Sequence, residues 1–207
     1  MADDFLDQPL SRFFESVASE SAAPGGGAAA AVTVALAAGL SAMAARLSVS
    51  QLDGSAQLLD QAERLRQRAT ELAQEDMMAF EAVHAAYALP KDRDPEQRRL
   101  RIRAALAGAT DVPLEIAEVA AQVAELAGHL ATVGNPNLKG DAVTGALLAL
   151  AGARSALALV EINVRQGRLE GPWRERAQAY VTTAAQVVDR SVEDAGLGRE
   201  RPLPPEQ

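Results

Sequence analysis

The segment Gly134–Asp141 reads Gly-Asn-Pro-Asn-Leu-Lys-Gly-Asp and ends in a carboxylate at the start of an almost uncharged helical pattern. A carboxylate in this place has two interpretations. As an N-cap, Asp141 accepts hydrogen bonds from free backbone N–H groups, and position alone favours this reading because Asp is a preferred N-cap. As a catalytic group, Asp141 transfers a proton to or from a small ligand.

A second segment of this kind, Pro24–Gly27, contains Gly25, Gly26 and Gly27 and opens another uncharged helical pattern. Glycines let a ligand approach the backbone, and N–H groups at a helix N-terminus bind anions. No Gly-Lys-Ser/Thr follows, which excludes a phosphate loop, and no strand precedes, which excludes a dinucleotide fingerprint. A tight structural turn and a ligand cradle both remain open.

Asp76 lies between Leu72 and Ala79 in an apolar seam whose residues recur at steps of four and three. An unpaired buried carboxylate is costly, so Asp76 is predicted to have a partner, to reach water or to line a cavity. A register-setting polar contact and a cavity wall are both open. No metal site is predicted, because His84 and His129 lack the Glu-x-x-His pairing of helical metal sites.

Helices must position these residues, because apolar side chains recur with helical period along nearly the whole chain. The predicted fold class is all-α, an up-down bundle of long helices, with residues 1–194 forming a single domain and 195–207 a flexible C-terminal tail. Pro113 predicts either a kink or a restart within one helix. The other helices are predicted over about 5–19, 25–47, 56–89, 141–168 and from 173 onward, with Pro95 in the first turn of the helix that contains Pro113.

The composition excludes several classes of protein. A net charge of -8 over 207 residues argues against a nucleic-acid partner. The absence of cysteine excludes disulfides, and with an acidic N-terminus that is unlike a signal peptide it favours a cytoplasmic location. The uncharged run Pro24–Ala45 is long enough to span a membrane, but it is mostly Ala and Gly. We therefore predict a helix buried inside a helical bundle, and no contact with a membrane.

Six short motifs occur in an order that is familiar as a set. The chain resembles the cyclodeaminase/cyclohydrolase family over about residues 5–190, a family that includes the cyclodeaminase domain of formiminotransferase-cyclodeaminase and stand-alone bacterial methenyltetrahydrofolate cyclohydrolases. The motifs are Pro24–Gly27, Asp76 with Ala79-Phe80, Leu89-Pro90-Lys91, Val112-Pro113-Leu114 with Ala117-Glu118, Gly134–Asn137 with Asp141, and Ile162-Asn163-Val164.

The resemblance implies an all-helical homodimer that dimerises through its helices and uses a one-carbon tetrahydrofolate as its ligand. It implies either hydrolysis of 5,10-methenyltetrahydrofolate to 10-formyltetrahydrofolate or deamination of formiminotetrahydrofolate, by acid/base catalysis with no cofactor beyond the folate substrate. It assigns Asp141 as the catalytic acid/base. The residues expected to bind substrate are Gly25, Gly26, Gly27, Asp76, Asn135, Asn137, Lys139 and Asn163.

Four places differ from the family pattern. Ala28 and Gly140 replace serines, Leu159 replaces an asparagine, and the loop Ser48–Gln51 lacks a basic residue. An alternative function therefore stays open, in which the chain is a non-catalytic folate-binding or helical interaction protein that has lost part of the family's site.

Positive charge is expected near the glutamate tail of a folate, and Lys139 is the favoured single contact. A basic cluster between Lys91 and Arg103 is split over two helix faces, with Arg99 and Arg103 on one and Arg98 and Arg101 on the other, which favours a solvated surface.

Overall fold

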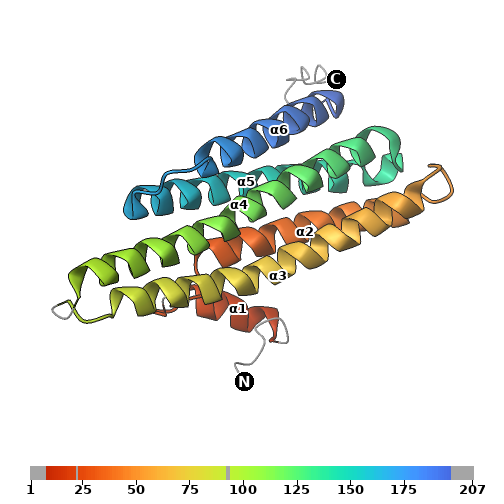
Figure 1. Cartoon of the computed structure of the whole chain (residues 1–207). Coiled ribbons are helices and arrows are strands. Elements are labelled where there is room, and N and C mark those ends of the chain that lie inside the picture. Colours follow the sequence, from red (N-terminus) through yellow and green to blue (C-terminus); the bar gives the residue numbers. More distant parts are fainter. Residues whose placement is uncertain (1–7, 22, 92–93, 197–207) are drawn as a thin grey trace, which may run out of the picture.

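The computed structural model describes residues 8–21, 23–91 and 94–196, and within these ranges it contains helices and no strand. The long helices run antiparallel in one bundle, with the short α1 against its side (Figure 1). The described chain forms a single bundle through Asp194, and most of the predicted tail and the start of the predicted first helix lie outside the described residues. The elements are α1 Leu10–Val17, α2 Gly26–Arg46, α3 Ser55–Tyr87, α4 Pro95–Val133, the 3₁₀ helix η2 Pro136–Leu138, α5 Lys139–Gly167 and α6 Trp173–Asp194.

α2 and α5 pack antiparallel within the core, and small residues bring the two helices close together. A Cβ on Gly152 would lie 2.4 Å from Cγ2 of Val34, and one on Gly145 would lie 3.2 Å from the carbonyl oxygen of Ala37. Alanine and glycine therefore replace bulky side chains along this contact, as the low aromatic content requires.

α2 and the segment Pro136–Gly167 are long and apolar enough to cross a membrane by composition alone. Within the bundle, 56% and 50% of their most apolar windows are buried. The prediction that the uncharged run forms a buried helix is thus confirmed for one side of α2, while the other side stays uncovered, with Leu36 61% exposed.

α4 passes through Pro113 without a break, so the predicted restart is wrong. Proline has no N–H to bond the carbonyl of Ala109 one turn earlier. The side-chain amide of Asn163 on α5 donates to that carbonyl at 2.8 Å instead. One amide from a neighbouring helix therefore replaces the missing backbone bond, and α4 remains a single helix of 39 residues.

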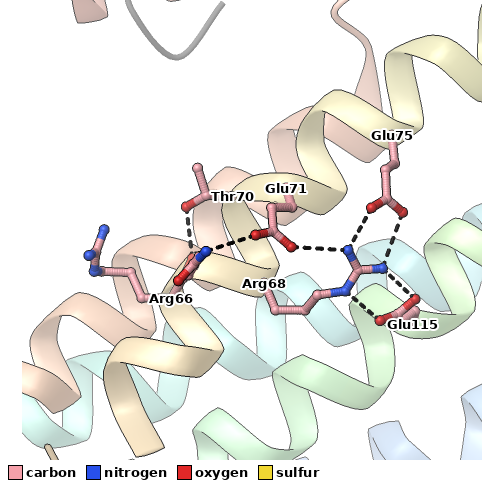
Figure 2. A network of polar contacts seen from close by, with 7 residues as sticks. Arg66, Arg68, Thr70, Glu71, Glu75 and Glu115 are labelled. Atoms are coloured by element: carbon pink, nitrogen blue, oxygen red, sulfur yellow. Dashed lines mark hydrogen bonds and ion pairs between the residues drawn. The ribbon is translucent and has the colours of Figure 1, made fainter. Parts of the chain in front are cut away.

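An ion-pair network ties α3 to α4 at about the middle of α3 (Figure 2). The guanidinium of Arg68 donates to both carboxylate oxygens of Glu115 on α4, at 2.6 and 2.8 Å, and also bonds Glu75 and Glu71 on its own helix. This network raises the pKa of Arg68 and lowers the pKa of Glu115, chiefly through the hydrogen bonds between them. The bidentate geometry fixes the relative position of the two helices.

Candidate active site

The glycine segment and Asp76 meet at the N-terminus of α2. The Asp76 carboxylate comes from α3, and its Oδ2 accepts a hydrogen bond from the backbone N–H of Ala28 at 2.9 Å. Gly25, the N-cap of α2, has no side chain to do this, so Asp76 caps the helix from a neighbouring helix.

Gly27 is the residue that lets this carboxylate approach the backbone. A Cβ at Gly27 would lie 1.9 Å from Oδ1 of Asp76, which no side chain can tolerate. Glycine is therefore required at position 27 by the close approach of a charged group. Both open interpretations of Asp76 hold, because it makes a specific polar contact and it lines a cavity.

A pocket of ≈ 360 Å³ opens at this point between four helices. Gly25, Gly26 and Gly27 form one wall, Asp76 and Phe80 a second, and residues of α4 and α5 close the rest. The complete lining is Ala23, Gly25, Gly26, Gly27, Asp76, Ala79, Phe80, Val83, Leu106, Ala109, Pro113, Leu159, Ile162, Asn163 and Gln166. A mostly apolar hollow with few polar groups is typical of a small-molecule site.

The half-buried carboxylate of Asp76 is the ionisable group of this pocket. Burial raises its pKa above the usual value for Asp, and the hydrogen bond from Ala28 offsets part of that rise. Since a raised pKa brings a carboxylate nearer to neutral pH, Asp76 is better suited to proton transfer than an ordinary aspartate.

Asn163 also belongs to the pocket, as the sequence predicts, and its amide is bonded to Ala109. Its position is thereby fixed by the gap that Pro113 leaves in α4. The rest of the side chain lines the pocket. Asn163 therefore both bonds the free carbonyl of α4 and forms part of the pocket wall.

The other four predicted site residues lie at the opposite end of the bundle, where the α4–α5 turn meets the α2–α3 loop (Figure 1). Ser48, just after α2, accepts from the N–H of Asn135, and the Asn135 amide donates to the carbonyl of Leu47. Asp141 and Asn163 begin and end α5, which separates them by about 30 Å along its axis. Within one chain, therefore, Asp141 does not share a pocket with the glycine segment.

The structure shows local contacts for three of these four residues and the helix position of the fourth. Asn135 caps η2 by accepting from the N–H of Asn137, and Lys139 donates to the carbonyl of Asp194 at the end of α6. Asp141 is not the N-cap of α5, because η2 leads directly into the helix at Lys139 and leaves Asp141 in the first turn. The interpretation of Asp141 as an N-cap is therefore wrong.

Several pocket residues were not singled out from the sequence as site residues. Phe80, Pro113 and Leu159 appeared only as parts of motifs or as substitutions, and Gln166 carried no signal at all. Their contribution depends on which helix faces meet. At the replaced positions, Leu159 makes the pocket wall apolar, and Ala28 contributes its backbone N–H, which is independent of its side chain.

Comparisons with known proteins identify relatives of this chain. The formiminotransferase-cyclodeaminase family model matches residues 9–179. Methenyltetrahydrofolate cyclohydrolase of Methylorubrum extorquens is 38% identical over 167 residues, which cover 77% of this chain and 80% of that protein. Formimidoyltransferase-cyclodeaminase of Sus scrofa is 32% identical over 200 residues, but this chain spans only 37% of its length.

A solved structure shares the whole architecture. Formiminotetrahydrofolate cyclodeaminase from Thermotoga maritima superposes with a TM-score of 0.79 at 26% identity, covering 92% of this chain and 98% of that one. With the family model matched over most of the bundle, the chain belongs to the formiminotransferase-cyclodeaminase family.

Proposed function

We propose that this protein is a one-carbon tetrahydrofolate enzyme, and specifically a methenyltetrahydrofolate cyclohydrolase that converts 5,10-methenyltetrahydrofolate to 10-formyltetrahydrofolate. The observation that carries the proposal is the Asp76 carboxylate, held beside the glycine backbone in a mostly apolar pocket. The cyclohydrolase is preferred to the cyclodeaminase because the Methylorubrum extorquens cyclohydrolase is 38% identical to this chain, whereas the Thermotoga maritima cyclodeaminase is 26% identical.

The proposed reaction moves protons at the methenyl carbon, and we assign this transfer to Asp76, with Asp141 of a partner copy completing the site. Asp76 takes a proton from water as its oxygen bonds to that carbon, which gives a neutral tetrahedral adduct. The bond from this carbon to N5 then breaks, N5 receives the proton from Asp76, and the hydroxyl releases its proton to solvent to leave the formyl group on N10. General acid–base transfer of this kind contributes about 100- to 10,000-fold.

Apolar side chains at the pocket rim suit a flat ring. Phe80 and Ile162 line the pocket yet remain 42% and 46% exposed. A reduced pterin placed between them would cover this apolar surface while its reacting carbon faces the carboxylate. Both residues therefore serve as positioning groups in the proposed complex.

We also propose a homodimer formed through the uncovered faces of α2 and α5. α2 carries no charge before Arg46, and Leu36, Leu47 and Leu147 are 61%, 52% and 45% exposed on these helices or directly after them. If the two-fold axis is perpendicular to these helices, the helices of the two copies run in opposite directions. The Asp141 end of one chain would then lie over the pocket end of the other. Asp141 and Lys139 would then reach the site from the partner copy.

One assay tests the proposed function. The protein is mixed separately with 5,10-methenyltetrahydrofolate and with formiminotetrahydrofolate, and methenyl absorbance is followed. We expect enzyme-dependent loss of the signal with the first substrate. A gain of signal with formiminotetrahydrofolate alone would identify a cyclodeaminase instead, and no change with either would contradict a catalytic role.

A further inference from the structure

The side-chain amide of Asn163 is held in one orientation by its partner on α4. A carbonyl oxygen only accepts hydrogen bonds, so the group of Asn163 that lies 2.8 Å from the Ala109 carbonyl must be the NH₂ group. The oxygen and nitrogen ends of an asparagine amide have nearly the same shape, and their hydrogen-bond partners decide which end faces which way. Ala109 therefore fixes Nδ2 on its own side and leaves Oδ1 on the other side of the amide.

Pro113 is the residue that leaves this carbonyl free. In a continuous α-helix the N–H of residue 113 would bond the Ala109 carbonyl, and proline has no N–H. Pro113 is buried and lines the same pocket as Asn163, so the missing bond lies at the pocket wall. A proline inside a helix is destabilising, yet this one provides the acceptor that orients a side chain of the pocket.

The Oδ1 atom of Asn163 is available as an acceptor. No hydrogen bond among the described residues ends at this atom, since the bond of the Asn163 side chain is the one from Nδ2 to Ala109. In the part of the chain that the structure describes, Oε1 of Gln74 is the buried side-chain atom without a partner. The unbonded Oδ1 of Asn163 is therefore open, and because Asn163 lines the pocket, a ligand there can reach it.

Fixed acceptors define which ligand groups suit this pocket. Three of its lining side chains carry hydrogen-bonding groups, namely Asp76, Asn163 and Gln166. Ionised Asp76 only accepts hydrogen bonds, and one of its oxygens is held by the N–H of Ala28. Gln166 is exposed and can offer either end of its amide. The two acceptors with fixed positions, Asp76 and Oδ1 of Asn163, therefore favour a ligand that presents N–H donors.

We infer that Pro113 is a positioning residue that acts through Asn163, by directing Oδ1 to accept a hydrogen bond from a ring N–H of the reduced pterin. This inference rests on the proposed function. In 5,10-methenyltetrahydrofolate the methenyl carbon and its two nitrogens carry no N–H, so the donors near the reacting carbon belong to the pterin ring. With the amide turned over, its NH₂ group would face these donors and both groups would lack an acceptor.

A double-mutant cycle on KM for 5,10-methenyltetrahydrofolate tests this role. In Pro113→Ala the alanine N–H bonds the Ala109 carbonyl, and the Asn163 amide is free to turn. We expect KM to rise roughly two- to tenfold, as loss of one neutral hydrogen bond allows. The change in kcat should be much smaller, because the ring contact is the same in the ground state and the transition state.

The second arm of the cycle shows whether Pro113 acts through Asn163. In a protein that already carries Asn163→Ala, the change Pro113→Ala should leave KM unaltered. Equal increases of KM in both backgrounds would overturn the inference, because they would show that the proline contacts the ligand or shapes the pocket by itself.

The matched control is Pro95→Ala, a change of the same kind in the same helix. Pro95 is exposed in the first turn of α4, where its missing N–H leaves no helical carbonyl unpaired, and it does not line the pocket. The control should keep the wild-type KM. A rise in KM equal to that of Pro113→Ala would overturn the inference.

The orientation of the amide is also measurable without a folate. In the ¹⁵N–¹H spectrum of the free protein, the NH₂ signals of Asn163 are identified by their absence in Asn163→Ala. We expect one of these protons to be protected from exchange with solvent in the wild type and unprotected in Pro113→Ala. Equal protection in both proteins would overturn the inference.

A binding measurement separates this inference from the proposed function. If 5,10-methenyltetrahydrofolate is not turned over, the proposed function fails, and calorimetry with tetrahydrofolate still tests the role of Pro113. Weaker binding by Pro113→Ala than by Pro95→Ala supports the inference. Equal binding by the two variants, or no binding by the wild type, rejects it.

Discussion

The Asp76 carboxylate both caps a helix and is partly buried, and these two features shift its pKa in opposite directions. Its carboxylate caps α2 through Ala28, which favours the ionised form, while burial disfavours that form and raises its pKa. The second effect is the larger. The folded protein therefore holds a proton on Asp76 more tightly than the unfolded chain does.

This balance predicts opposite effects of Asp76→Asn on activity and stability. We expect turnover to fall about 100- to 10,000-fold, because the amide cannot transfer the proton. The stability that protonated Asp76 contributes is fully present below its unfolded pKa and is lost as the pH rises through the raised folded pKa. The variant should therefore melt at a higher temperature than the wild type at pH 7, and thermal melts across pH measure this.

The difference in melting temperature should vanish below about pH 4, where both proteins are uncharged at this position. In the wild type, the acidic limb of kcat/KM should inflect above the ordinary Asp value. A variant that is less stable than the wild type at pH 7 would show that the cap outweighs burial.

At the scale of elements, α4 depends on a contact from another helix to remain continuous. Pro113 leaves the Ala109 carbonyl without its helical partner, and Asn163 supplies one from α5. We predict that Asn163→Ala destabilises the protein by about 1–3 kcal/mol, because a partly buried acceptor loses its donor. Urea unfolding measures this cost.

Pro113→Ala provides the matched background, since alanine restores the backbone N–H that the Ala109 carbonyl lacks. In that background Asn163→Ala should cost about 1 kcal/mol less than in the wild type, which a double-mutant cycle isolates. The same cost in both backgrounds would mean that the amide matters for packing or for the pocket, and not for repair of the helix.

At the scale of the whole molecule, the two groups of predicted site residues lie at opposite ends of α5. A two-fold dimer would bring them together, and mixed dimers test it. Asp76→Asn and Asp141→Asn are expected to be nearly inactive alone. Mixed in equal amounts after unfolding and refolding, they should recover roughly a quarter of the wild-type activity, because half of the dimers then carry one intact site.

Size measurement by light scattering accompanies this experiment and should give a dimer. If the mixture forms dimers and recovers no activity, Asp76 of one copy does not share a site with Asp141 of the other. Full activity of Asp141→Asn alone would remove Asp141 from the reaction. The inactive control is the double variant Asp76→Asn/Asp141→Asn. Its mixed dimers with either single variant contain no intact site.

The sequence by itself determined the helices, because apolar spacing, Pro95 and the glycines mark them locally. The predicted range 56–89 became α3 Ser55–Tyr87, and Pro95 lies in the first turn of α4 as expected, with Asp94 as the N-cap. The sequence also identified Asp76 as a seam carboxylate that needed a partner, and it grouped the glycine segment and Asn163 by their resemblance to a family. These features depend on neighbouring residues in the chain or on the spacing of apolar residues, and both can be read from a sequence.

Only the tertiary structure decided which of these features share a pocket. The partner of Asp76 is 48 residues away in the chain, and Asn163 reaches a carbonyl 54 residues away. Which groups meet depends on how antiparallel helices align end to end, and helical period says nothing about that alignment. For this reason the structure united Gly25–Gly27, Asp76 and Asn163, and placed Asp141 at the other end of the bundle.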